Sequence, residues 1–454
     1  MEDLLAARLQ MAFTLGFHII LACFGVGLPV LLLIAEGLYL RTGKPVYQQL
    51  AKRWAKAFAV LFAVGAVSGT VLSFELGILW PKFMGTFGSV ISLPFTLEGF
   101  AFFLEAIFVG IYLYGWDKLS PIAHWLSAIP IAISGFASAW FVVTANAWMN
   151  APQGFEFVNG KVVNPDPVRA MFNPATWAQT THMILAAYIV SGFCVAGFYA
   201  WQLLRKDGED GLQSTRQNKR EYNQVAMALG LFLGAVCMPL QMAAGDWSAK
   251  VVAKTQPIKF AAMESHFHTE EGASLLIGGI PDMETKTIHY GIKVPKLLSF
   301  LAFGDFDAEV QGLEEFPEDQ IPPVPVVHLA FQLMIATGTA LMLYSLWALF
   351  RCLRNRSEFF KSRLFLWSAI ISGPFAIIAL EAGWTVTEVG RQPWIVYGVM
   401  RTREAVTGAT GLVNILIVTL LIYFVLLAGC ISVLRFLAAK PIENLAALES
   451  DKTT

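Results

Sequence analysis

The chain has 454 residues, a formal net charge of −1 and 56% hydrophobic residues, and only 14% of its residues are charged. Soluble domains carry about 25% charged residues, so this composition excludes an ordinary soluble enzyme. The apolar residues are gathered in long runs, which is typical of a helical membrane protein. The five cysteines show no CxxC or CxxCH spacing, which argues against a cysteine metal cluster and against covalently attached haem.

Nine apolar runs predict nine transmembrane helices, because each is near the roughly 20 residues that a bilayer requires. The acidic start, Met1-Glu2-Asp3, lacks the basic region of a cleaved signal, so we expect the first span to be retained. The expected spans are 12–39, 55–79, 94–115, 123–148, 180–204, 223–243, 326–350, 364–384 and 411–436. The predicted fold class is therefore an all-α integral membrane protein.

The short loops predict how these helices are oriented. Loops 40–54, 205–221 and 351–363 are rich in Lys and Arg and alternate with poorer loops. Cytoplasmic loops carry such an excess, so we expect the N-terminus outside (periplasmic) and the C-terminus in the cytoplasm. Residues 1–243 would then hold helices one to six and 326–454 helices seven to nine with a cytoplasmic tail. The long polar segment 244–325 would form a partly ordered external loop.

Several ionisable residues lie inside the predicted spans. Glu98 and Glu105 are two helical turns apart (105 − 98 = 7), so both fall on one face about 10 Å apart. Ionised acids are costly in hydrocarbon, so we expect this pair to carry protons or to contact a ligand. The alternative is that one of the two acids forms a hydrogen bond with a neighbouring helix and the other acid lies at the membrane edge. His18 and His182 are each open to two interpretations, a hydrogen bond between helices or ligation of a metal or haem iron.

The stretch 384–394, WTVTEVGRQPW, places Glu388 and Arg391 at a helix end that is broken by Gly and Pro. Ionisable groups near hydrocarbon usually mark a ligand, a pathway or a partner. The alternative is a solvated loop with an incidental charge pair.

Several motifs together carry a family resemblance. The chain resembles subunit I of the cytochrome bd-type quinol oxidases, in the branch with a short external quinol loop that includes the cyanide-insensitive oxidases. The likeness covers nearly the whole chain, and the combination of GRQPW with EGFAFFLE is highly specific. The stretches that carry it are RLQMAFTLGFH (8–18), LEGFAFFLEAIFVGIYLYGWD (97–117), TANAWMNAPQGF (144–155), the span around His182, PIKFAAMESHF (257–267), FQLMIATG (331–338) and GWTVTEVGRQPW (383–394).

The resemblance implies a set of haem ligands. His182 and Met334 would hold the iron of a low-spin haem b that accepts electrons from quinol. His18 and Glu388 would each bind the iron of one high-spin haem. The implied cofactors are two haem b and one haem d, or three haem b. From the residues alone we would interpret Met334 as a packing residue, because methionine in a transmembrane helix usually fills space between apolar side chains.

The resemblance also implies roles for other residues. Glu98 and Glu105 would deliver protons or contact the high-spin haems. Trp384 and Arg391 would also lie near the high-spin haems. Asp117 would lie near the site of proton uptake from the cytoplasm. Lys259 and Glu264 would take part in quinol binding and oxidation. From the residues alone we would interpret them as a solvated ion pair on the surface. Gln332 departs from the long-loop members, which commonly carry Arg at this position.

The expected activity is that of a terminal respiratory oxidase. It would oxidise membrane quinol on the outer side and reduce O2 to water with cytoplasmic protons, which generates a proton gradient without pumping. The implied partners are a second polytopic subunit (subunit II) and, in some members, a small single-span subunit, in the lipid of the bacterial cytoplasmic membrane. No nucleic-acid partner is expected.

Two other classes of protein remain open from the residues alone. Intramembrane acids also suit a proton-coupled transporter, although we find no inverted repeat. A haem-b electron-transfer protein would need only one ligand pair, such as His182 and Met334. If the protein is an oxidase, we expect a purified preparation to be red-brown or greenish and its optical spectrum to have both low-spin and high-spin haem bands. A colourless preparation would contradict it, and purely low-spin bands would favour the electron-transfer protein.

Overall fold

The structure, a computed structural model, describes residues 2–205, 213–354 and 359–441. The basic loop residues Lys206 and Arg356 and the last part of the expected tail, 442–454, lie outside these ranges. Within them, nine helices are long and apolar enough to cross a membrane, which confirms the predicted number and fold class. They are α1 (Glu2–Thr42), α2 (Pro45–Leu79), α3 (Pro81–Tyr114), α4 (Pro121–Asn150), α6 (Thr176–Leu204), α7 (Gln213–Thr255), α10 (Val324–Arg354), α11 (Arg363–Val389) and α13 (Leu412–Ala439).

Local sequence signals set where the helices begin. Pro45, Pro81 and Pro121 open α2, α3 and α4, where the missing N–H would have no partner within the helix. The Ser362 hydroxyl accepts a hydrogen bond from the Phe365 N–H and so caps α11.

The helices extend beyond the apolar runs from which they were predicted. The clearest case is α7, which continues to Thr255, so residues 244–255 of the expected external loop are helical. Asp246 and Lys250 form an i,i+4 ion pair at 2.6 Å on this extension, which stabilises a helix where the sequence is no longer apolar.

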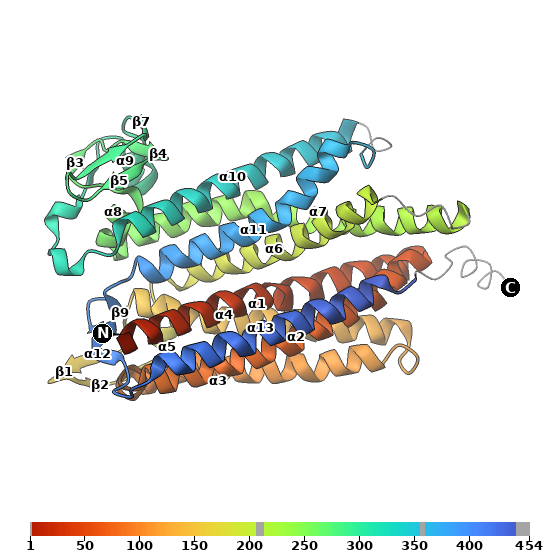
Figure 1. The fold of residues 1–454 in the computed structure, drawn as a ribbon, viewed down its shortest axis with the longest axis horizontal. Coiled ribbons are helices and arrows are strands. Elements are labelled where there is room, and N and C mark those ends of the chain that lie inside the picture. Colours follow the sequence, from red (N-terminus) through yellow and green to blue (C-terminus); the bar gives the residue numbers. More distant parts are fainter. Residues whose placement is uncertain (1, 206–212, 355–358, 442–454) are drawn as a thin grey trace.

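The bundle consists of two groups of helices that lie side by side (Figure 1). The first group contains α1, α2, α3, α4 and α13, and the second contains α6, α7, α10 and α11; α6 packs against α1, α4, α7 and α11. The helices α6 and α7 approach each other closely at glycines, since a Cβ on Gly192 would come within 2.5 Å of the Gly234 nitrogen. Small residues of this kind let two membrane helices bring their backbones together.

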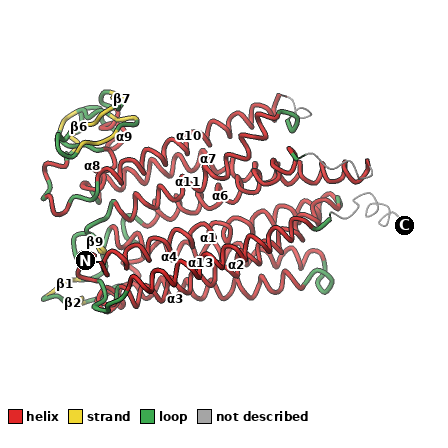
Figure 2. The backbone as a smooth tube through the Cα atoms, viewed as in Figure 1, coloured by secondary structure: helices red, strands yellow, loops and turns green. Residues whose placement is uncertain are grey.

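The strands are confined to one end of the bundle, as Figure 2 shows. Residues 256–323 form a small lobe there, in which antiparallel pairing joins β3 to β8, β4 to β7 and β5 to β6. Its elements are α8 (Pro257–Glu264), β3 (Glu270–Glu271), β4 (Leu275–Ile277), β5 (Ile280–Asp282), β6 (Thr287–His289), β7 (Ile292–Val294), α9 (Leu297–Phe303), β8 (Glu309–Val310) and the 3-10 turns Leu313–Glu315 and Glu318–Gln320. The remaining short elements are β1 (Glu156–Val158), β2 (Lys161–Val163), α5 (Pro167–Met171), β9 (Trp394–Val396), β10 (Met400–Arg401) and α12 (Thr402–Ala405).

The lobe is fastened to α10 by side-chain hydrogen bonds. Gln332 uses both ends of its amide: Oε1 accepts from the Gly278 N–H at 2.9 Å and Nε2 donates to the Leu276 carbonyl at 3.1 Å. His328 Nδ1 lies 2.8 Å from the Met263 carbonyl. The residue that departs from the long-loop pattern therefore serves as a clamp between lobe and bundle. The N-terminus lies at the same end as the lobe (Figure 1), as expected if both face the same side of the membrane.

Candidate functional site

A cavity of about 740 Å³ lies inside the bundle between α1, α2, α3, α4 and α11. Its volume is in the upper part of the range of about 300–1,000 Å³ that is usual for ligand pockets. The lining brings together six of the eleven predicted site residues, which are His18, Glu98, Glu105, Trp384, Glu388 and Arg391.

His18 on α1 is oriented by Ser68 on α2. The Ser68 hydroxyl donates to the Gly65 carbonyl at 3.0 Å, so it can accept the proton of His18 Nδ1, which lies 2.9 Å away. This arrangement leaves Nε2 of a neutral imidazole free to act as a ligand. Gly69 makes room for the ring, since a Cβ there would come within 2.9 Å of His18 Cε1.

The two acids of α3 both line the cavity, which confirms that they share one face. Glu98 accepts a hydrogen bond from Ser138 at 3.3 Å. Glu105 is 4% exposed, and its Oε1 is buried without a hydrogen-bond partner among the described residues. A third acid, Glu381 on α11, also lines the cavity and was missed from the sequence. Its signal was its spacing from Glu388 (388 − 381 = 7), which equals that of Glu98 and Glu105.

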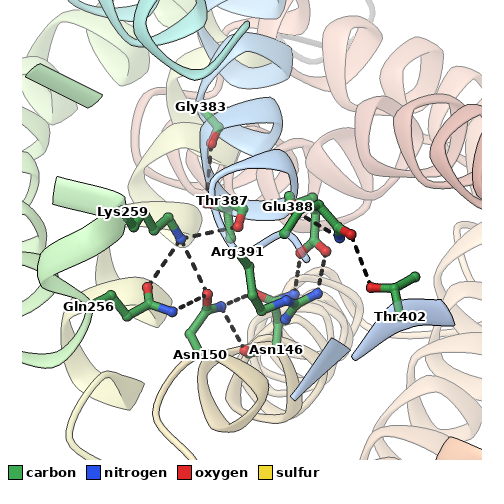
Figure 3. Close-up of polar contacts among 10 residues, drawn as sticks. Asn146, Asn150, Gln256, Lys259, Gly383, Thr387, Glu388, Arg391 and Thr402 are labelled. Carbon is green, nitrogen blue, oxygen red and sulfur yellow. Dashed lines mark hydrogen bonds and ion pairs between the residues drawn. The ribbon is translucent and has the colours of Figure 1, made fainter. Parts of the chain in front are cut away.

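Glu388 is held from two sides at the end of α11 (Figure 3). Asn146 Nδ2 donates to Glu388 Oε1 at 2.6 Å, and the Arg391 guanidinium pairs with Oε2. A carboxylate offers about four lone-pair sites, so these two contacts leave acceptor capacity for a metal ion. Asn146 was not predicted, because an isolated amide near a helix end carries no chemical signature.

Buried polar atoms without hydrogen-bond partners indicate which kind of group would fit in the cavity. Among the described residues, Nε and Nη1 of Arg391, Nε1 of Trp384 and one oxygen each of Glu105 and Glu381 have no hydrogen-bond partner. Such groups are costly unless something satisfies them. Guanidinium donors suit the carboxylate substituents of a haem, and the free nitrogen of His18 suits its iron. These residues therefore fit a haem.

His182 on α6 and Met334 on α10 lie outside the cavity lining. His182 Nδ1 is buried without a partner in the described part of the chain, and Nε2 lies 3.2 Å from the amide nitrogen of Gln241. Each of the two predicted ligands faces a glycine on a neighbouring helix. A Cβ on Gly245 would come within 3.4 Å of His182 Cε1, and one on Gly383 within 2.9 Å of Met334 Sδ. The orphaned ring nitrogen and the two uncrowded side chains fit ligation of an iron.

Asp117 is exposed in the turn between α3 and α4, away from the cavity lining. This turn lies at the end of the bundle opposite the lobe (Figure 1). A role in proton uptake remains a prediction.

Lys259 and Glu264 are both on α8 and are only 2% and 4% exposed, so the interpretation as a solvated surface ion pair is wrong. They form no hydrogen bond or ion pair with each other in the described part of the chain. Burial lowers the pKa of Lys259 to about 7, and the nearby Arg391 adds to this effect against the opposing charge of Glu388. Burial raises the pKa of Glu264 to about 8. Both groups can therefore exchange protons near neutral pH.

The bundle and its cavity define a polytopic membrane protein that can hold a large iron-containing group. The chain belongs to the family described as cytochrome bd terminal oxidase subunit I, whose model matches residues 6–442. It is 38% identical to the "Putative cytochrome bd menaquinol oxidase subunit I" of Bacillus subtilis (strain 168), over 99% of this chain and 100% of that one. It is 32% identical to the "Cytochrome bd ubiquinol oxidase subunit 1" of the same strain, over 90% and 86% of the two chains.

A solved structure shows the same fold. The bd oxidase from Geobacillus thermodenitrificans matches with a TM-score of 0.88 and 38% identity, over 96% of this chain and 98% of that one. The predicted family is thus confirmed, and with it a multi-pass protein of the bacterial cytoplasmic membrane that works with haem and pairs with a second subunit. A transporter is no longer an alternative, and neither is an electron-transfer protein without oxygen chemistry.

Gly383→Ala should disturb Met334 selectively. The new Cβ would collide with Sδ, the movable part of a flexible side chain, so the thioether should shift while the helices stay in place. We expect altered low-spin haem bands, unchanged high-spin bands and an unchanged melting temperature. Gly338→Ala is the matched control, because its Cβ would enter open space on α10. Identical low-spin bands in the two variants would argue against Met334 as a ligand.

Proposed function

We propose that this chain is the haem-carrying subunit of a terminal oxidase that oxidises membrane quinol on the outer side and reduces O2 to water inside the bundle. The main support is that six residues, from α1, α3, α11 and the segment after it, line one cavity. The proposed cofactors are two haem b and one haem d, or three haem b. A second polytopic subunit, and in some assemblies a small single-span subunit, would complete the enzyme.

The bound haems would supply the electron path and the iron at which O2 binds. His182 and Met334 would hold the low-spin iron, while His18 and Glu388 would hold the two high-spin irons. Ser68 fixes the ring proton of His18 on Nδ1 and so keeps Nε2 available. Arg391, which also lines the cavity, offsets the charge of Glu388 and keeps two donors that no described residue bonds.

Reduction of one O2 to two waters consumes four electrons and four protons, so protons must reach the cavity. Glu98 and Glu105 lie along one face of α3 at the cavity wall, and Glu105 has an oxygen that no described residue bonds. Carboxyl groups at such positions can accept a proton and pass it on. We propose that they deliver protons from the cytoplasmic side, with uptake near Asp117 at that end of the bundle.

Each quinol that is oxidised releases two electrons and two protons, so two quinols serve one O2. We propose that Lys259 and Glu264 take part at the outer side, because both are buried on α8 and can exchange protons near neutral pH. Protons released outside and protons consumed from the cytoplasm together generate a gradient without a pump. This scheme requires the predicted orientation, with the lobe and the N-terminus outside.

Glu105→Gln should slow oxygen reduction more than it weakens quinol binding. The amide keeps the size of the side chain but cannot carry a proton, and loss of such a group typically costs on the order of 10²-fold in rate. We expect kcat at saturating quinol to fall by about that factor while KM for quinol changes little. Glu156→Gln, an exposed acid on β1, is the control for the loss of one carboxylate. Turnover equal to that of the control would remove Glu105 from the proton path.

A further inference from the structure

A continuous row of hydrogen bonds joins Lys259 on α8 to Glu388 at the end of α11 (Figure 3). Lys259 Nζ donates to Asn150 Oδ1 at 3.2 Å and to the Thr387 carbonyl at 3.1 Å. Asn150 Nδ2 donates to Asn146 Oδ1 at 3.1 Å and to the Asn146 carbonyl at 2.9 Å. Asn146 Nδ2 in turn donates to Glu388 Oε1 at 2.6 Å. Two amides one helical turn apart on α4 thus bridge the lobe and the cavity.

The Glu388 end fixes the direction of the side-chain bonds in this row. The carboxylate that Glu388 presents to Arg391 can only accept, so Asn146 turns its NH2 group to Glu388 and its oxygen to Asn150. Asn150 must then donate to Asn146 through its NH2 group, which leaves its own oxygen to accept from Lys259. Gln256 strengthens the first step, because its Nε2 also donates to Asn150 Oδ1 at 3.1 Å.

Lys259 is seated on α11 as firmly as on α4. Its aliphatic chain lies against Gly390, where a Cβ would come within 3.0 Å of Lys259 Cε. Its ammonium group bonds the Thr387 carbonyl in the last turn of α11, where the helix dipole favours a positive charge. The lobe thus contacts the bundle one residue away from Glu388.

We propose that Asn146 and Asn150 are positioning residues that hold the Glu388 carboxylate in an orientation set by Lys259, and so couple helix α8 of the lobe to the high-spin site. This inference rests on the proposed role of Glu388 as an iron ligand. Asn150 tests it best, because this residue is 1% exposed and lies outside the cavity lining. An effect of Asn150 on the cavity must therefore pass through the residues it bonds, either through Asn146 to Glu388 or through Lys259 to the last turn of α11.

The experiment compares Asn150→Asp with the wild type in the purified, complete oxidase. The new carboxylate can still accept a hydrogen bond from Lys259, but its second oxygen faces Asn146 and can only accept there. Asn146 would then have to turn its NH2 group to this oxygen, which leaves its own oxygen facing the Glu388 carboxylate. We expect shifted or weakened high-spin bands with unchanged low-spin bands. We also expect kcat to fall by about tenfold or more at nearly constant KM for quinol, because small misplacements at a reacting site are costly. Asn164→Asp, the same change on an exposed loop, should leave the bands and the turnover unchanged.

If Asn150→Asp fails to accumulate, Asn150→Ser removes the bridge without adding charge and should change the same bands in the same direction. A raised KM for quinol with unchanged high-spin bands would overturn the proposal and assign Asn150 to quinol binding alone, and unchanged bands with unchanged kinetics would also overturn it. A wild-type enzyme without high-spin bands would instead contradict the proposed function on which the inference depends.

Discussion

Polar groups inside an apolar bundle must find partners, and several side-chain atoms of the residues that line the cavity find none among the described residues. The contrast with Glu36 is instructive, because it is an equally buried acid in the same bundle. Its two oxygens are bonded by Tyr112 at 2.7 Å and by His124 at 2.6 Å. Around the cavity, Arg391, Trp384, Glu105 and Glu381 all keep buried polar atoms without a partner among the described residues. A haem with carboxylate substituents is the kind of group that these atoms require.

The surroundings of the four predicted iron ligands show two ways of placing a side chain. Glycines lie opposite three of the four predicted iron ligands, with Gly69 at His18, Gly245 at His182 and Gly383 at Met334. The fourth ligand, Glu388, is held by an amide and a guanidinium instead. Three of the predicted ligands thus have room because a glycine lies opposite, and the fourth is held by a hydrogen bond and an ion pair. The three glycines and Asn146 each come from a different helix than the ligand they contact, whereas Arg391 follows Glu388 by three residues, so the site depends largely on the packing of the bundle.

Much of the fold could be predicted from the sequence, because the bilayer imposes a simple rule on span length and polarity. The rule failed at α7, since a helix can continue as far as Thr255 after its sequence becomes polar. The shared face of Glu98 and Glu105 followed from helical spacing alone. The same spacing would have identified Glu381, which lies just before the stretch 384–394 in which Glu388 was noticed for its position at a broken helix end. Met334 came only from the resemblance, and Asn146 and Asn150 could not be found, because only the fold shows what an amide bonds. The burial of Lys259 and Glu264 likewise depends on how the lobe docks.

The central claim is that His18 and Glu388 each reach an iron in the cavity, and that Glu388 is more than the partner of Arg391. A high-resolution density map of the purified, haem-loaded oxidase would test this most directly. The account predicts two irons in the cavity, one within bonding distance of His18 Nε2 and the other bonded by the Glu388 carboxylate, with Asn146 still donating to that carboxylate. A map in which Glu388 bonds only Asn146 and Arg391, with no iron beside it, would contradict the account.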